Sequence, residues 1–293
     1  MVKRKGKQQV FVMRTFCYHG RLSIRDYNSE KMMNTDDRLS PDSRDFVAAL
    51  ASGLEVLQAF DQQHPRMTLS EVAAKTGMYR AKARRFLLTL HALGYLDKQQ
   101  RHFALTPRVL QLGNAFLAAN PYRVVIQHYL EEITREIGES TSLGVLDGDD
   151  VVYIARSAAE HRLMAIRLSV GTRLPAAYTS MGRVLLAQLP EAELAASLAR
   201  VPLQAHTEHS ITDKAELRRA IEQVRRQGYA IVDQELDSGL RSVAVPAFDQ
   251  RGQLLGAINI STNAARVDMN TLTGRFLPLL QDKARQIQES LQG

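Results

Sequence analysis

Basic side chains gather in one short stretch of the sequence, residues 79–93. Arg80, Lys82, Arg84 and Arg85 follow one another there with no acidic residue between them. Ammonium and guanidinium groups bind phosphate oxygens, and arginine can also donate two hydrogen bonds to the edge of a guanine. Contact with DNA is one interpretation. The alternative is an ordinary solvated helix face, which is the commoner reason for a run of like charge.

A helix over residues 79–93 would separate this charge from an apolar face. At about 100° per residue, one side of the helix collects Ala83, Phe86, Leu87, Leu90 and Leu93. A shorter helix over residues 71–76 precedes it and ends at Gly77, and two helices joined by such a turn are typical of a helix-turn-helix. The second helix of that motif fits the major groove of DNA, with its early residues nearest the bases.

Two neighbouring segments complete this first domain. Residues 46–60 predict a helix that buries Phe46, Val47, Leu50, Leu54, Leu57 and Phe60, which recur every three or four positions. Residues 95–105 alternate apolar and polar side chains around a polar tip, which predicts a hairpin that would act as a wing along phosphates. The turn, the wing and the lack of acidic partners together favour DNA binding. The candidate DNA-binding residues are Tyr79, Arg80, Lys82, Arg84, Arg85, Thr89, Lys98 and Arg101.

Charge and periodicity divide the chain into unequal parts. Residues 62–108 carry nine Lys or Arg against two acidic residues, whereas residues 109–293 carry 19 against 21. Strands, hairpins and helices follow one another in the second half, including a strand over residues 162–168 and a closing helix over residues 272–291. This order predicts an α+β fold rich in antiparallel pairing. We expect a basic, disordered tail over residues 1–45, a winged helix-turn-helix domain over 46–106, a connecting helix over 107–120 and a second domain over 121–293.

The tail shows neither helical nor strand periodicity. Arg14 interrupts its only apolar run, so it is not a convincing signal peptide, and no run of 18 apolar residues that could span a membrane occurs in the chain. The single cysteine, Cys17, cannot form an internal disulfide, which fits a reducing, cytoplasmic setting. Two alternatives remain for the tail: it is a basic arm, or it is an extension of a protein that starts at Met32 or Met33.

Both halves of the chain resemble IclR-type bacterial transcriptional regulators. Three segments resemble the winged-helix domain of that family: "LASGLEVLQAF", "TLSEVAAKTGMYRAKARRFLLTLHALGYL" and "FALTPRVLQLG". Two further segments resemble its effector domain: "VGTRLPAAYTSMGRVLLA" and "VDQELDSGLRSVAVPAFDQRGQLLGAINIST". The segment "TSMGRVLLA" most resembles the subfamily that controls protocatechuate, 4-hydroxybenzoate and β-ketoadipate catabolism. The resemblance covers residues 46–291, and the tail has no counterpart in it.

The resemblance implies a GAF-like, effector-binding fold for the second domain, with a small acidic effector. It also implies a palindromic operator of double-stranded DNA read by a homodimer or homotetramer, because a palindrome mirrors the two-fold symmetry of its protein. We therefore expect a transcriptional regulator of aromatic-compound catabolism. The alternative is a metabolite-binding sensor that does not itself regulate an operator.

Candidate effector-binding residues follow from chemistry and from the resemblance. A carboxylate needs fixed donors, and the residues that start a helix offer free N–H groups, which makes Thr179, Ser180, Met181 and Gly182 candidates. Family sites carry over to Ser242, Asn259 and Ser261, and the last two share a strand face. Asp233 or Glu235 could bind a ligand hydroxyl or order its loop, and Arg173 could pair with the ligand or with Asp233. The alternatives are that Ser180 is only a helix cap, and that Asn259 and Ser261 only satisfy nearby backbone groups.

Motifs that would indicate an enzyme do not occur in the sequence. It contains no G-x-S-x-G, H-E-x-x-H, GxGxxG or Walker motif, so we expect no catalytic residues and no cofactor. Asp147, Asp149 and Asp150 cluster at an expected hairpin turn, where solvated acids are common, and they lack the spacing of a calcium-binding loop. His206 and His209 beside Glu208 are weak evidence for a metal, and we expect none.

Overall fold

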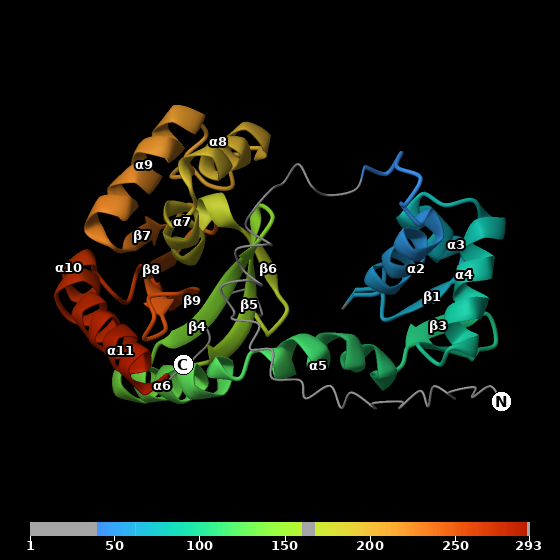
Figure 1. Ribbon diagram of the computed structural model, residues 1–293, viewed down its shortest axis with the longest axis horizontal. Coiled ribbons are helices and arrows are strands. Elements are labelled where there is room, and N and C mark those ends of the chain that lie inside the picture. The colour runs from blue at the N-terminus through green and yellow to red at the C-terminus, as the bar shows by residue number, and fades with distance from the viewer. Residues whose placement is uncertain (1–39, 62, 160–167, 292–293) are drawn as a thin grey trace, which may run out of the picture. The chain divides into compact units, whose positions relative to one another are not determined.

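The computed structural model describes residues 40–61, 63–159 and 168–291 of the chain. The tail up to residue 39 and nearly all of the strand expected over residues 162–168 lie outside these residues. The N-terminal part contains a helix-turn-helix and a small antiparallel sheet in the strand order β1-β3-β2. Its elements are α2 (Ala48–Gln58), β1 (Arg66–Thr68), α3 (Leu69–Thr76), α4 (Arg80–Ala92), β2 (Leu96–Gln99) and β3 (His102–Leu105) (Figure 1).

Local signals begin and end the two helices of the motif. Thr68 caps α3, because its hydroxyl accepts the Glu71 N–H while the Glu71 carboxylate accepts the Thr68 N–H at 2.6 Å. This reciprocal arrangement satisfies two donors that a helix start otherwise leaves unpaired. Gly77 ends α3 with φ of 64°, a left-handed conformation that favours glycine, and the chain turns into α4 at Tyr79.

The core of the N-terminal part is formed by α2, α3, α4 and the sheet. Ala83, Leu87 and Leu90 of α4 are buried as the periodicity predicts, but Leu93 is 51% exposed. The helix predicted over residues 46–60 is present, but three of its six predicted core residues are exposed: α2 buries Ser52 and Val56, with Ala59 and Phe60 buried just beyond its end. The predicted core residues Val47, Leu50 and Leu54 are 61%, 63% and 45% exposed. Periodicity identified an apolar face but could not tell whether this chain covers it.

A connector follows the sheet. The 3₁₀ turn η2 (Pro107–Val109) leads into α5 (Leu110–Ala119), so the expected connecting helix begins as a tighter turn at its proline. None of the ten residues of α5 is buried by the described chain, although the helix carries no charge and most of its side chains are apolar.

The C-terminal part is built on an antiparallel sheet, which within the described residues has six strands in the order β6-β5-β4-β9-β8-β7. The expected α+β class is confirmed by this mixture of sheet and helices. The strands are β4 (Ser140–Asp147), β5 (Asp150–Ser157), β6 (Arg173–Pro175), β7 (Ala230–Asp233), β8 (Leu240–Phe248) and β9 (Leu254–Asn263). The helices are α6 (Tyr122–Ile137), α7 (Ser180–Ala187), α8 (Glu191–Arg200), α9 (Lys214–Gln227), α10 (Met269–Thr271) and α11 (Leu277–Ser290).

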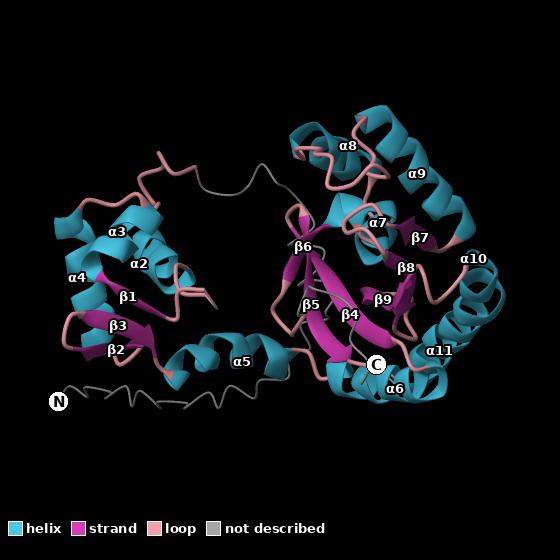
Figure 2. Cartoon of the chain, turned by 180° about the vertical axis from the view of Figure 1, so that it is seen from behind, coloured by secondary structure: helices cyan, strands magenta, loops and turns pink. Residues whose placement is uncertain are grey.

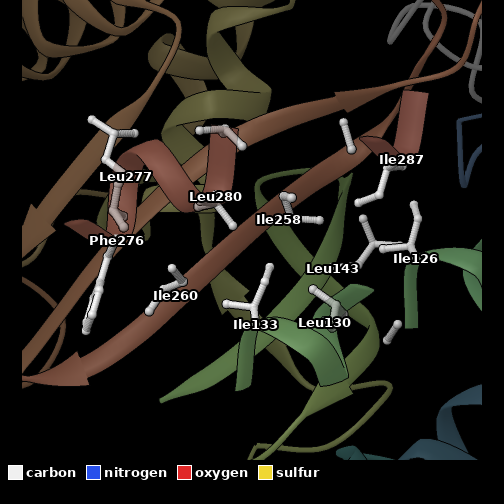
Figure 3. Packing of buried hydrophobic residues seen from close by; sticks show 14 of the residues in the cluster. Ile126, Leu130, Ile133, Leu143, Ile258, Ile260, Phe276, Leu277, Leu280 and Ile287 are labelled. Carbon is white, nitrogen blue, oxygen red and sulfur yellow. The ribbon is translucent and has the colours of Figure 1, made fainter. Parts of the chain in front are cut away.

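One face of this sheet carries the larger hydrophobic core. Ile258 and Ile260 of β9 face Leu280 of α11 and Ile133 of α6, and all four side chains are fully buried (Figure 3). The alternating pattern of the central strands therefore delivers one set of side chains to this core and the other set to the opposite face.

The opposite face of the sheet is covered by α7, on which α9 packs, with α8 next to α9 (Figure 2). All eight residues of α7 are buried. A 3₁₀ turn, η3 (Ala176–Tyr178), leads from β6 into this helix. The sequence analysis did not anticipate α8, and it predicted a single helix over residues 272–291. The structure begins that helix at Met269 and interrupts it with the π-helical turn η4 (Leu272–Phe276) just before Pro278, which has no N–H to donate.

Candidate functional site

The candidate DNA-binding residues of α4 lie on its outer side. Tyr79 is the residue that caps the helix and is 86% exposed, and Lys82, Arg84 and Arg85 are exposed along the first two turns. Thr89 is exposed one turn further, where its hydroxyl donates to the Arg85 carbonyl oxygen at 2.8 Å. The helix therefore presents a polar, basic face while Ala83, Leu87 and Leu90 hold its other side in the core.

The positive charge on this face is not neutralised by any residue that the structure describes. Among the described residues, no acidic side chain forms an ion pair with Lys82, Arg84 or Arg85. Arg80 donates to the Ser70 hydroxyl of α3, which holds its guanidinium over the start of the helix-turn-helix. A solvated face would be expected to mix both signs of charge, whereas an unpaired basic face is suited to a polyanion.

The hairpin of β2 and β3 adds two further cations. Lys98 of β2 and Arg101 in the turn are exposed, and Gln100, also in the turn, adopts φ of 54°. β3 also pairs with β1, with Met67 opposite Phe103, so the hairpin is anchored to the core by a third strand that the sequence analysis did not predict. All eight candidate DNA-binding residues are thus exposed on α4, on its cap or on this wing.

A pocket lies in the C-terminal part between α7, the sheet and the loop after β7. The space between protein atoms in and around it is about 490 Å³, a volume that includes its opening to solvent. Five of the ten candidate effector-binding residues line it: Thr179, Ser180, Ser242, Asn259 and Ser261. The remaining lining residues were not anticipated and are Tyr153, Leu168, Leu174, Tyr178, Val232, Leu236 and Leu240.

The start of α7 forms one polar wall of this pocket. Thr179 caps the helix, since its hydroxyl accepts the Gly182 N–H at 3.1 Å. Ser180 is therefore not the cap, and its Oγ is buried without a hydrogen-bond partner among the described residues. Nor does any described residue accept from the backbone N–H groups of Ser180 and Met181. A helix start with free donors beside a pocket can bind an anionic group.

The sheet forms the facing polar wall. Ser242 of β8 lies directly opposite Ser261 of β9 in the strand pairing, and Asn259 lies two residues from Ser261 on the same face. The Asn259 side-chain amide donates to the Ser261 hydroxyl at 2.9 Å, while its Oδ1 is buried without a partner in the described chain. Unsatisfied buried polar atoms are rare in folded proteins and mark sites where a ligand or water completes the bonding.

Two tyrosines complete the lining. Burial raises the pKa of Tyr153 to about 12, so its phenol is neutral at physiological pH and can donate a hydrogen bond. The Tyr178 hydroxyl accepts the Gln204 N–H at 2.7 Å, and the edge of its ring meets His206 with ring centroids 4.7 Å apart. Aromatic and aliphatic side chains around a few polar groups are typical of small-molecule sites.

The other five candidates, which are Met181, Gly182, Asp233, Glu235 and Arg173, lie outside the pocket lining. The Met181 side chain is buried, and Gly182 packs against the backbone of Ala176. The Asp233 carboxylate pairs with Arg241 through contacts of 2.8 and 2.9 Å.

Arg173 does not form the pair with Asp233 that was one expectation. It binds Asp147 at 2.7 Å and Asp150 at 3.1 Å on the surface, because β6 pairs with β5 beside the β4–β5 turn. The acids of that turn are therefore not simply solvated, and Asp149 likewise binds Arg200 of α8 at 2.6 Å. Hydrogen bonds from Arg200 lower the pKa of Asp149.

Two other kinds of site, a metal site and a membrane-spanning helix, gain no support from the described residues. In the described ranges, no group of three or more His, Cys, Asp or Glu side chains is placed to hold a metal ion. No helix of the described residues is long and apolar enough to cross a membrane.

Comparison with known proteins assigns the family. Residues 49–100 match the family model of the IclR helix-turn-helix domain, and residues 115–289 match the one for the C-terminal part of the bacterial transcriptional regulator IclR. The Pca regulon regulatory protein of Pseudomonas putida is 44% identical over 249 residues, which are 85% of this chain and 86% of that protein.

Solved structures agree with this assignment. A transcriptional regulator from Rhodococcus sp. RHA1 is 46% identical, with a TM-score of 0.73 over 84% of this chain and 98% of that chain. The inducer-binding domain of a PobR double mutant from Acinetobacter, in complex with 3-hydroxybenzoic acid, is 29% identical, with a TM-score of 0.54 over 57% of this chain and 97% of that one. The expectation of a DNA-binding regulator rather than an enzyme is confirmed, and the chain belongs to the IclR family of bacterial transcriptional regulators.

Proposed function

We propose that this regulator senses a small hydroxy-substituted aromatic carboxylate of the protocatechuate and β-ketoadipate pathways in the pocket beside α7. The observation that carries the proposal is the pair of unsatisfied atoms in the pocket walls, Ser180 Oγ and Asn259 Oδ1. Leaving a polar group buried and unpaired costs about 1–3 kcal/mol. A ligand that pairs both atoms regains this cost, which makes the pocket selective for a ligand with polar groups at two places.

The two walls suit different groups of such a ligand. The α7 wall offers the free N–H groups of Ser180 and Met181 and the Ser180 hydroxyl, which are donors for a carboxylate. The sheet wall offers an acceptor, Asn259 Oδ1, and a hydroxyl, Ser261 Oγ, which suit a ligand hydroxyl that both donates and accepts. Between the walls, the ring of the ligand would contact Leu174, Val232 and other apolar lining residues. The 3-hydroxybenzoic acid bound by the related inducer-binding domain has both kinds of group.

The basic face of α4 is the proposed reader of the operator. We assign base contacts to Arg84 and Arg85, and contacts with phosphates to Lys98 and Arg101 of the wing. The support is their exposure and the absence of acidic partners for the two α4 arginines in the described chain. Recognition helices place only a few side chains on base edges, whereas wings and flanking residues add contacts that do not depend on sequence.

We further propose that the protein acts as a homodimer or a dimer of dimers on a palindromic operator. Helices α2 and α5 each expose an apolar face to solvent in one chain, which includes Leu50 of α2 and Leu110 and Leu112 of α5. α5 has no charged residue, so a second copy of the same uncharged helix can cover it without burying an unpaired charge. Exposed apolar faces of this kind are typical of interfaces in monomers taken out of their assembly.

A two-stage experiment tests the proposal. A thermal-shift screen against 4-hydroxybenzoate, 3-hydroxybenzoate, protocatechuate and β-ketoadipate identifies the effector, and a ligand present at 100 times its Kd should stabilise the protein by about 2.7 kcal/mol. Fluorescence anisotropy with a palindromic promoter fragment then measures DNA affinity with and without that ligand. A ligand that binds without any change in DNA affinity would favour the alternative of a sensor that does not regulate an operator directly.

A further inference from the structure

A buried ion pair joins α7 to the loop between β7 and β8. The Arg183 guanidinium donates from Nη1 to Glu235 Oε1 at 2.7 Å and from Nη2 to Glu235 Oε2, in a two-pronged arrangement. The Arg183 side chain is 5% exposed and that of Glu235 is 10% exposed. Neither residue lines the pocket, and neither was assigned a pairing in the sequence analysis.

Arg183 also holds the backbone that leads into the polar wall of the pocket. Its Nε donates to the Ala177 carbonyl oxygen at 3.1 Å. The next three residues, Tyr178, Thr179 and Ser180, all line the pocket. The direction of the Ser180 hydroxyl and of the free N–H groups therefore depends on a segment that Arg183 fixes from behind.

Glu235 holds the other side of the pocket in the same way. Its neighbour Leu236 lines the pocket, and Leu240 lines it at the far end of the same loop. The backbone around Glu235 is tied down separately, because the Ser210 hydroxyl donates to the Glu235 carbonyl oxygen at 2.6 Å and the Thr207 hydroxyl donates to that of Gln234 at 2.6 Å. The carboxylate of Glu235 is thus the link from this ordered loop to α7.

Stability alone is a poor explanation for such a pair. Removing two charges from water offsets most of their attraction, and apolar replacements are often equally stable. A two-pronged arginine–carboxylate contact does fix direction and distance more tightly than packing of aliphatic side chains. An apolar residue at position 183 could not reproduce the hydrogen bonds that Arg183 donates to the Ala177 carbonyl oxygen and to Glu235.

We propose that Arg183 and Glu235 are positioning residues that set the separation between the α7 wall of the pocket and Leu236 of the loop after β7, and thereby the selectivity for the shape of the effector. Arg183 fixes Tyr178–Ser180 through the Ala177 carbonyl group, and Glu235 fixes Leu236 against them. Because Glu235 neutralises it, the guanidinium is not left free to bind the carboxylate of the effector itself. The inference rests on the proposed function, since it assumes that the effector occupies this pocket.

The test compares two bidentate arginine pairs in the same domain. Glu235→Gln and Arg183→Lys each remove the two-pronged contact while keeping a similar side-chain size. Arg200→Lys is the matched control, because Arg200 makes the same kind of two-pronged contact with Asp149, and neither of these residues nor their immediate neighbours in the chain line the pocket. Calorimetry with 2-, 3- and 4-hydroxybenzoate gives the ratio of dissociation constants for the three isomers, and thermal unfolding without ligand gives stability.

We expect the ratio between the best and the worst isomer to shrink by about tenfold in Glu235→Gln and Arg183→Lys, and to stay as in the wild type in Arg200→Lys. A loss of thermal stability alone, equal in all three variants and with the isomer ratio unchanged, would overturn the inference. Failure of both Glu235→Gln and Arg183→Lys to fold would also overturn it, because the pair would then be a requirement of the fold. If the wild-type protein bound none of the three isomers, the proposed function would fail instead. It would also fail if the Ser180→Ala protein bound them as tightly as the wild type does.

Discussion

Gly182 lies so close to Ala176 that a Cβ atom at position 182 would come within 2.1 Å of the Ala176 carbonyl oxygen. This contact brings the first turn of α7 down onto the 3₁₀ turn η3. It also explains why glycine follows Met181 in a helix whose every residue is buried. The role of Gly182 is to permit the close approach, and the neighbouring Thr179 and Ser180 reach the pocket as a consequence.

Gly182→Ala should therefore separate α7 from η3. The obstacle is backbone rather than a flexible side chain, so we expect a loss of about 3 kcal/mol of unfolding free energy together with weaker effector binding. Gly274→Ala is the control, because a Cβ there meets nothing within 4 Å and should change stability by less than about 1 kcal/mol. Chemical denaturation of both variants gives the comparison. Equal stability of the two would show that α7 can shift without cost.

Ser180→Ala should weaken effector binding without harming the ligand-free protein. Its hydroxyl is buried and unpaired, so removing it takes away a desolvated group and should leave the melting temperature unchanged or higher. Loss of a hydrogen bond to a carboxylate should raise the effector Kd by about tenfold.

Ser197→Ala is a control with the opposite signature. Ser197 is also buried, but its hydroxyl donates to Asp149 Oδ1 at 3.2 Å, so its loss should lower stability and leave effector affinity as it was. Melting curves and calorimetry on the two variants test this pairing. A Ser180→Ala protein that is less stable without ligand, yet binds effector normally, would mean that the hydroxyl serves the fold.

Sequence reasoning was strongest where the signal is local. The basic face of α4 follows from helical periodicity and from charges that need no distant partner. The glycine turns likewise depend on neighbouring positions, although the caps of α3 and α7 are Thr68 and Thr179, and Ser180, which was considered as a cap, is not one. The pocket candidates Asn259 and Ser261 could be placed on one strand face because side chains alternate along a strand.

What the sequence could not supply depends on pairing across the fold. Tyr153 and Leu236 reach the pocket only because β5 and β7 lie in one sheet with β4, β9 and β8 between them. Several acidic residues along the chain could pair with Arg173. The register of β6 on β5 places Arg173 beside Asp147 and Asp150, so it pairs with these two. Exposure of Leu50 was missed because periodicity reports which face is apolar and not what covers it.

Arg84→Ala should reduce sequence discrimination on DNA. If Arg84 contacts a base edge, its loss should cost about 1–3 kcal/mol on the operator and much less on random duplex. Lys98→Ala on the wing is the comparison, and it should weaken binding to both duplexes alike and lower the slope of log K against log salt by about one. Anisotropy titrations at several salt concentrations measure both effects. An unchanged ratio of operator to random affinity in Arg84→Ala would place this residue on phosphate or away from DNA.

Leu110→Glu should dissociate the assembly while leaving each chain folded. Leu110 is 71% exposed in one chain, so a charged side chain there costs the isolated chain little. In an assembly that covers α5 with its copy from a second chain, the same substitution buries two like charges, which strongly disfavours association.

Val170→Glu is the matched control for this last prediction, because Val170 is 47% exposed on a segment of the C-terminal part outside α2 and α5. Analytical ultracentrifugation should find Leu110→Glu shifted to the monomer, and Val170→Glu should remain as the wild type. If each subunit reads one half-site, as proposed, the monomer should also lose most of its affinity for the palindrome while it keeps that for a single half-site. A Leu110→Glu protein that remains a stable dimer would exclude α5 as the interface and leave the exposed face of α2 as the surface to test next.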